Sequence, residues 1–178
     1  LSEIKLSSSF AKNDKNLIIA ITSNRGLCGG FNANIVKALN GTVNKGDEIV
    51  CIGKKGAESF KRRGRNIVEE YIDILDNCSQ KKSKKIYQKI INGFLQGQWS
   101  KVLLVYNSFK NAGTQIIKQE QVLPIKLNDE IPPQKLKQDY IFEPDKTQII
   151  NKLVPDKIHT HLFEAILNSI ASEHGARM

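Results

Sequence analysis

The chain has 178 residues, of which 40% are hydrophobic and 25% are charged, and its formal net charge at pH 7 is +9. This length and composition are typical of one globular domain with a hydrophobic core. The longest apolar runs, such as Leu17–Ile21 and Val102–Tyr106, are far shorter than the ~20 residues of a membrane-spanning helix. The three cysteines form no CxxC pair, which favours free thiols in a reducing compartment.

The first half of the chain alternates short apolar runs with short helical stretches. Strands are expected at residues 17–22, 49–52 and 67–74. Between the first two strands, Asn32 is expected to cap a helix that stops at Asn40-Gly41. A second helix is expected at residues 57–63, with Gly64 at its C-terminal end.

The clearest helix is predicted at residues 84–96, with Ser83 as its cap and Gly97 at its end. Its apolar residues form one stripe at helical spacing: Ile86, Tyr87, Ile90, Ile91, Phe94 and Leu95. Strands are then expected at residues 102–106, 115–118 and 121–125. This alternation predicts an α/β fold with a mostly parallel sheet and helices on both of its faces, as in Rossmann-like domains.

The last part of the chain is expected to be a connection followed by a long helix. Residues 128–138 read as an extended connection, and Tyr140–Glu143 as a possible edge strand. A helix is expected to begin at Pro155, which suits a first helical position. Its predicted apolar face consists of Ile158, Leu162, Phe163, Ile166, Leu167, Ile170, Ala171 and Met178.

The division expected from this pattern is a central α/β domain at residues 1–154 and a helix at residues 155–178. The chain does not begin with Met and stops within the expected helix. These features favour a fragment of a longer protein, although a natural end with a frayed last turn is the alternative.

The loop Arg25–Gly30 is the most conspicuous candidate site, because it lies between a predicted strand and a predicted helix. Glycines in such a loop can let backbone N–H groups approach a phosphate. However, the spacing matches neither G-x-G-x-x-G nor G-x-x-x-x-G-K-[ST], and the second strand ends at Gly53 without an acidic residue for a ribose. The residues alone leave a nucleotide site and a structural turn both open.

Two basic runs, at residues 61–65 and 81–85, contribute much of the positive charge. They could be solvated faces, docking faces for acidic protein or lipid head groups, or contacts to nucleic acid. Aromatic residues are not interleaved with them, which disfavours nucleic acid. His159 and His161 lie too far around a helix to share a metal, and no nucleophile motif is present. We therefore expect no catalytic residue, no metal site and no cofactor.

Several segments, in order along nearly the whole chain, resemble the gamma subunit of F-type ATP synthases. The segments are TSNRGLCGGFNA at residues 22–33, VYNSFKN at 105–111, QVLPI at 121–125, YIFEPD at 140–145 and ASEHGARM at 171–178. Two positions depart from the family pattern: Asn24 stands where Asp is more usual, and Gly175 where Ala is common. The Gly175 departure should soften the helix by about 1 kcal/mol.

The resemblance implies the function of a central-stalk rotor subunit. In that family the N- and C-terminal helices form a coiled-coil shaft inside the hexamer of alpha and beta subunits. The α/β domain lies below the hexamer, bound to the epsilon subunit and the membrane c-ring. Rotation of the c-ring by protons turns the shaft, which drives ATP synthesis or hydrolysis at sites on the beta subunits. The resemblance thus implies a non-catalytic subunit without a cofactor.

The resemblance also implies roles for particular residues. Tyr140, Phe142 and Glu143 would contact epsilon and the ring, whereas Glu173 and Arg177 would lie on the lower shaft and could pair with each other. Arg25, Gly26, Gly29 and Gly30 would shape a structural loop and not a catalytic site.

The implied location is peripheral, on the cytoplasmic face of a bacterial plasma membrane, or alternatively on the matrix side of the mitochondrial inner membrane. Membrane association would be through the complex only, and no nucleic acid would bind. The rival hypotheses are a stand-alone nucleotide-binding α/β domain and a basic RNA-associated domain.

Overall fold

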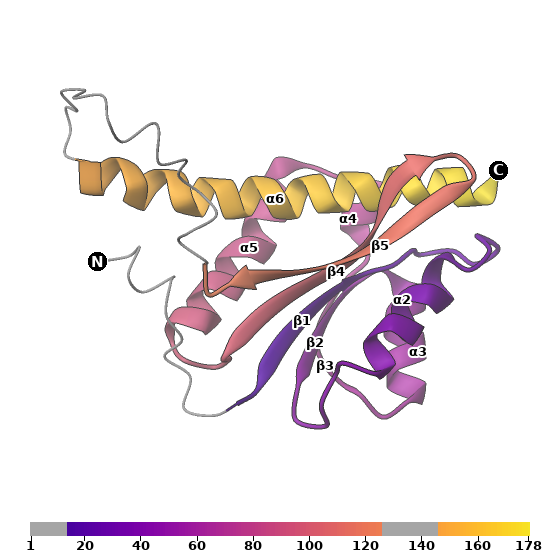
Figure 1. Cartoon of the computed structure of the whole chain (residues 1–178), viewed down its shortest axis with the longest axis horizontal. Helices are drawn as coiled ribbons and strands as arrows, with labels where there is room; N and C mark the ends of the chain where they lie inside the picture. The colour runs from indigo at the N-terminus through magenta and orange to yellow at the C-terminus, as the bar shows by residue number, and fades with distance from the viewer. Residues whose placement is uncertain (1–13, 126–145) are drawn as a thin grey trace.

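A computed structural model of the chain describes residues 14–125 and 146–178, with side chains described for 14–125 and 155–178. A five-stranded sheet forms its centre, in the order β3-β2-β1-β4-β5 (Figure 1). The strands are β1 (Asn16–Ile21), β2 (Glu48–Ile52), β3 (Asn66–Tyr71), β4 (Lys101–Asn111) and β5 (Thr114–Leu123). All neighbours are parallel except β4 and β5, which form an antiparallel hairpin. The predicted α/β fold with a mostly parallel sheet is confirmed.

Helices cover both faces of this sheet. They are α2 (Phe31–Asn40), α3 (Lys54–Arg62), α4 (Asp73–Asp76), α5 (Gln80–Leu95) and α6 (Lys146–Arg177). One core cluster joins α2 and α3 to one face, and a second joins α4, α5 and α6 to the other face (Figure 1). Because the central strand β1 is covered on both faces, it is a continuous apolar run, as the sequence indicated. Within the described residues, no helix is both long and apolar enough to cross a bilayer.

Two predicted helix caps are wrong. Gly30, not Asn32, is the N-cap of α2, and Asn32 lies in the first turn. Ser79, not Ser83, caps α5, since its side chain accepts a hydrogen bond from the Lys82 backbone N–H at 3.2 Å. The first turn of α5 is rich in lysine and lacks large apolar residues, so the hydrophobic pattern could not indicate where the helix begins.

Other element boundaries also differ from the prediction, and the two strands expected at residues 115–118 and 121–125 form one strand, β5. The third strand ends at Tyr71 instead of residue 74, and the short helix α4 follows it. The long helix begins at Lys146, so Pro155 lies inside α6 and not at its start. A proline has a helical φ and removes one backbone N–H donor, which interrupts the hydrogen bonding of a long helix at one position. The division into residues 1–154 and 155–178 stays a prediction.

The face of α6 that packs on the sheet is only partly the predicted one. Leu162 and Ile166 are buried, and Ile158 and Ile170 pack against the same cluster. In contrast, Leu167 is 45% exposed, and Ala171 and Met178 are also exposed. Small residues take their place in the interface: Ala165, Ser169 and Ser172 are buried. Small side chains allow a helix backbone to lie close to the sheet, and a search for large apolar residues misses them.

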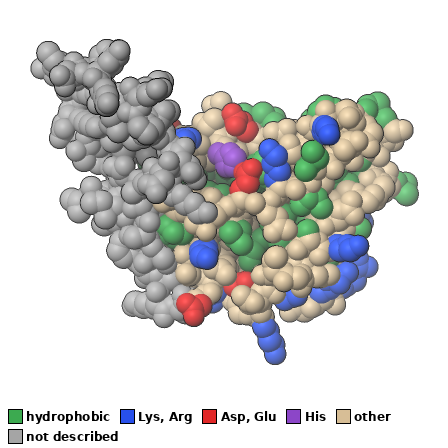
Figure 2. Space-filling model, in the orientation of Figure 1, with side chains coloured by type: hydrophobic (Ala, Val, Ile, Leu, Met, Phe, Trp, Pro, Cys, Tyr) green, Lys and Arg blue, Asp and Glu red, His purple; other side chains and the backbone are tan. Residues whose placement is uncertain are grey.

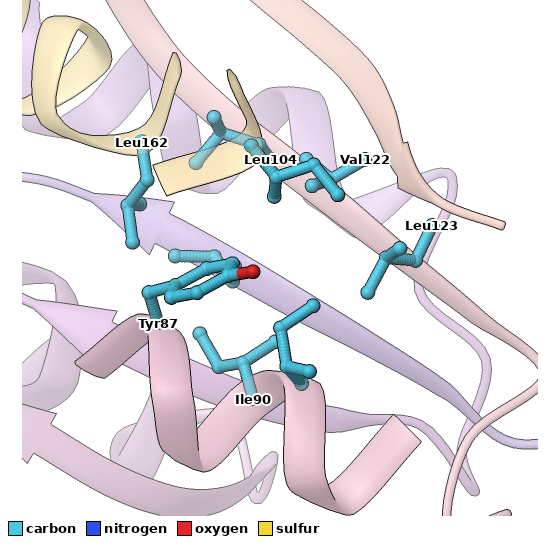
Figure 3. A pocket seen from close by; sticks show the side chains of 9 residues that line it. Tyr87, Ile90, Leu104, Val122, Leu123 and Leu162 are labelled. Carbon is cyan, nitrogen blue, oxygen red and sulfur yellow. The ribbon is translucent and has the colours of Figure 1, made fainter. Parts of the chain in front are cut away.

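The interface between α5, α6 and the sheet is close-packed. Figure 3 shows Tyr87 and Ile90 of α5 facing Leu162 of α6, Leu104 of β4 and Leu123 of β5 across a small apolar space. The volume of this cavity is only about 10 Å³. Burial raises the pKa of the Tyr87 phenol, to about 12, so this phenol is neutral at physiological pH. The two helices are therefore fixed to the sheet by a nearly complete apolar contact.

We expect Leu162→Ala to destabilise the protein by about 2–5 kcal/mol, because it enlarges this cavity in a close-packed interface. The measurement is equilibrium unfolding in urea. Leu167→Ala on the exposed side of the same helix is the matched control and should cost less than about 1 kcal/mol. Equal losses for the two variants would contradict this packing of α6 on the sheet.

Candidate partner-binding site at the carboxyl end of the sheet

Three segments that are distant in sequence meet at one end of the molecule (Figure 1). They are the loop at residues 22–30 after β1, the β4–β5 turn at Ala112-Gly113, and the end of α6 from Ser172. The Ser172 hydroxyl donates to the Asn107 backbone oxygen at 3.1 Å, and the Asn107 amide donates to the Phe31 backbone oxygen at 3.2 Å. We call this region the loop end.

The loop after β1 has a fixed shape because its own side chains hold it. The Ser23 backbone N–H donates to Asn32 Oδ1 at 2.9 Å, and the Asn32 amide donates back to Ser23 Oγ at 2.7 Å. The Ser23 hydroxyl also lies 2.6 Å from the Arg25 backbone oxygen. Cys28 is buried beneath the loop, 3.4 Å from the Asn32 amide nitrogen. Asn32, predicted as a helix cap, instead ties the loop to the first turn of α2.

Leu27 is the most exposed large apolar residue at the loop end. Its side chain is 99% exposed and its φ is 62°, a left-handed conformation that is uncommon for leucine. Among the predicted loop glycines, Gly29 has a φ of 60°, which explains a glycine at that position. Arg25, two positions before Leu27 in the chain, is also exposed. Leu27 could not be identified as a contact residue from the sequence, because a single leucine in a loop carries no periodic signal.

The Asn24 side chain joins the loop to the neighbouring β-strand connections. Its Oδ1 atom accepts from the Lys54 backbone N–H at 3.1 Å, at the start of α3. Its Nδ2 group donates to the Ile72 backbone oxygen and to Asp76 Oδ2, each at 3.0 Å. An aspartate could not donate to these two acceptors. The asparagine thus fits this chain, in which Asp76 supplies a carboxylate at the same place.

The start of α3 is occupied by protein groups. Thr22 Oγ1 accepts from the Gly56 backbone N–H at 3.0 Å, and Asn24 accepts from Lys54. Gly53, with a φ of 112°, lies so close to Thr22 that a Cβ atom there would be 2.6 Å from the threonine hydroxyl oxygen. Because these N–H groups are already bound, the N-terminus of α3 is a poor site for a phosphate.

The predicted pair at the end of α6 is present. Arg177 donates to Glu173 Oε1 through Nε at 2.9 Å and through Nη2 at 2.6 Å. Gly175, between them, faces the β4–β5 turn. Their role as partner contacts stays a prediction, as does the role of Tyr140, Phe142 and Glu143, which lie outside the described residues.

Two of the three cysteine thiols, those of Cys51 and Cys78, have a raised pKa. Burial raises the pKa of the Cys51 thiol, to about 12, and that of Cys78 also lies above its usual value. These two thiols are therefore protonated at physiological pH and are poor nucleophiles. Across residues 14–125 and 155–178, no group of three His, Cys, Asp or Glu side chains could hold a metal ion.

Comparison with known proteins shows which chains this one is similar to. A family model described as ATP synthase matches residues 2–178. The ATP synthase gamma chains of Cytophaga hutchinsonii and Christiangramia forsetii are each 42% identical to it over 91% of this chain. The chain spans only 59% and 57% of those two proteins.

Solved structures show the same fold. One is the central stalk and c-ring of Tetrahymena thermophila mitochondrial ATP synthase, with a TM-score of 0.70 at 21% identity over 99% of this chain and 79% of that chain. Another is the rotor of Euglena gracilis mitochondrial ATP synthase, with a TM-score of 0.70 at 20% identity over 98% of this chain and 71% of that chain.

We expect Asn24→Asp to destabilise the protein by about 1–2 kcal/mol at pH 7, because two hydrogen bonds are lost and a second carboxylate faces Asp76. The like charge should raise the folded-state pKa of the new carboxyl group above its unfolded value. The folded state then binds more protons, so the loss should shrink as the pH falls through about 4. Urea unfolding at pH 7 and at low pH measures both effects.

The control is the same substitution in an Asp76→Asn background, which returns a donor amide to the pair. In that background we expect Asn24→Asp to cost clearly less than in the natural chain. An equal cost in both backgrounds would contradict the proposed pairing of Asn24 with Asp76.

Proposed function

The chain belongs to the ATP synthase gamma-chain family, and on that premise we propose that it is part of a central-stalk rotor subunit. The subunit would couple rotation of the membrane c-ring to ATP synthesis or hydrolysis at sites on the beta subunits. Since the chain spans less than two thirds of the two gamma chains compared above, we propose this function for a whole protein that contains such a segment.

The observation that carries the proposal is the arrangement of α6. This helix has 32 residues, which corresponds to a length of about 48 Å, and it runs along the whole described molecule (Figure 1). One side of it is fixed to the sheet, while Leu167 and Met178 are exposed and Phe163 is half-buried. The exposed residues lie at helical spacing and would suit a second helix, as in a coiled-coil shaft.

The loop end supports a contact role toward the alpha and beta subunits. Leu27 presents an apolar side chain at the tip of a loop that internal hydrogen bonds hold in place. Glu173 and Arg177 lie at the same end of the molecule, on α6. A rotor must transmit force through such contacts, so a loop whose backbone is held in place is better suited than a flexible one.

The remaining partner contacts rest on the resemblance alone. Tyr140, Phe142 and Glu143 would contact the epsilon subunit and the c-ring. The subunit would have no catalytic residues of its own and would associate with the membrane through the complex. We place it on the cytoplasmic face of a bacterial plasma membrane, since the relatives compared above are bacterial, with the mitochondrial matrix side as the alternative.

The rotor function can be tested in a chimera. This chain would replace the matching segment of the Cytophaga hutchinsonii gamma chain, and the complex would be reconstituted in vesicles with that organism's other subunits. We expect ATP-driven proton pumping, measured by quenching of a pH-sensitive dye. Leu167→Glu in the chimera should reduce pumping at unchanged folding, because it places a charge on the shaft face of α6.

Leu95→Glu is the matched control, since Leu95 is also partly exposed, at 37%, but lies on α5. It should leave pumping within about twofold of the parent chimera. An assembled chimera that hydrolyses ATP without pumping, or equal effects of the two leucine variants, would contradict the proposed role.

The rival nucleotide-binding function predicts a different result with the isolated chain. We expect calorimetric titration with Mg-ATP to show no binding tighter than about millimolar, because the first backbone N–H groups of α3 are already bound by Thr22 and Asn24. A micromolar dissociation constant at one site would favour the nucleotide-binding alternative over the rotor.

A further inference from the structure

The two basic runs of the sequence lie in different electrostatic environments. The first run, around the end of α3, is explained by the fold. Lys61 forms an ion pair with Glu70, and Arg65 Nη1 donates to the Val43 backbone oxygen at 3.2 Å. Lys61 and Arg62 also lie in the last turn of α3, where the helix dipole favours positive charge. Figure 2 shows basic side chains gathered on the side that carries α2 and α3.

The second basic run, at residues 81–85, lies at the N-terminal end of α5, where positive charge destabilises a helix. Lys81, Lys82, Lys84 and Lys85 occupy the start of α5, and its first turn contains no acidic residue. The positive end of the helix dipole disfavours these charges, and the pairs at i, i+3 and i, i+4 repel one another. Within residues 14–125 and 155–178, these four lysines form no ion pair. The fold therefore does not explain them.

A groove adjoins this lysine cluster. It lies where the end of β3 and α4 meet α5, and its volume is about 390 Å³. Its lining combines apolar groups with charges of both signs: Glu70, Tyr71, Ile72, Asp73, Ile74, Lys82, Lys85 and Ile86. Ile74 and Ile86 are buried, whereas Ile72 is 37% exposed and remains available for contact.

We propose that this groove and the lysine cluster form a docking site for an acidic segment of a partner protein. Carboxylates of the segment would face Lys81, Lys84 and Lys85, and one of its apolar side chains would enter the groove beside Ile72. Lys81, Lys84 and Lys85 are exposed and lie within about one turn of α5, so one short segment can contact all three.

Charge complementarity favours a protein segment over a membrane surface. A flat anionic bilayer that contacts the lysines would also approach the carboxylate of Asp73, which lines the same groove. A folded segment can place its carboxylates on the lysine side and leave the acidic side uncovered. The proposal goes beyond the rotor function and does not depend on it.

The test uses the full chain and a fluorescent amphipathic peptide of glutamate and leucine. The control ligand is the same peptide with glutamine in place of each glutamate. Anisotropy titration at moderate salt should show binding of the glutamate peptide only. The triple variant Lys81→Glu, Lys84→Glu, Lys85→Glu should weaken binding at least about tenfold. Ile72→Ala should weaken it severalfold, because the apolar contact is reduced.

The matched control is Lys37→Glu, Arg62→Glu, Arg63→Glu, which changes the net charge equally on other exposed positions. It should change peptide affinity less than about twofold at moderate salt. Thermal unfolding of each variant shows whether a loss of peptide binding results from a loss of folding. The α5 triple should raise the melting temperature, since acidic residues suit a helix N-terminus, whereas the control should lower it.

Three results would overturn the proposal. Equal weakening by both triples would show a long-range charge effect without a site. Equal binding of the glutamate and glutamine peptides would show that the contact is apolar and does not depend on the carboxylates. Binding to phosphatidylserine vesicles that requires Lys81, Lys84 and Lys85, with no binding of the glutamate peptide, would assign the cluster to a membrane surface.

Discussion

Asn107 joins the two sides of the sheet at the loop end, and the arrangement of the functional surface depends on it. Its backbone oxygen accepts from Ser172 of α6, and its side chain donates to the Phe31 backbone oxygen at the start of α2. Asn107 is only 2% exposed, so these bonds are shielded from water. One buried residue of β4 thus connects the long helix on one face with the loop and helix on the other.

The strands and the apolar stripe of α5 could be predicted from the sequence because their large apolar residues are either continuous or periodic. The helix caps could not, since Ser79 and Ser83 are equally good capping residues and only packing decides between them. The inner face of α6 was predicted only partly, because Ser169 and Ser172 carry no hydrophobic signal. A pattern of large apolar residues therefore predicts that a helix is present. It is a weaker guide to which face of that helix packs against the sheet.

The loop end illustrates a related limit. The family resemblance implied a structural loop at residues 25–30, but the bonds that hold it come from Ser23 and Asn32 on either side of it. Asn24 reaches Ile72 and Asp76, which lie far along the chain. Such contacts depend on the parallel crossover connections, which bring the carboxyl ends of β1, β2 and β3 to one edge. Local sequence could suggest a turn but not its partners.

Gly175 shows how the same close packing offsets a cost in helix stability. Glycine in a helix interior costs about 1 kcal/mol relative to alanine. A Cβ atom at this position would lie 3.2 Å from the Phe109 ring and 3.4 Å from Ala112 in the β4–β5 turn, so the Phe109 ring would have to move by a few tenths of an ångström. Asn107 lies on β4, the strand that leads into this turn. Ser172, which bonds to Asn107, lies about one helical turn before Gly175 on α6. The glycine therefore allows the β4–β5 hairpin to lie close to α6, near the buried hydrogen bond between Ser172 and Asn107.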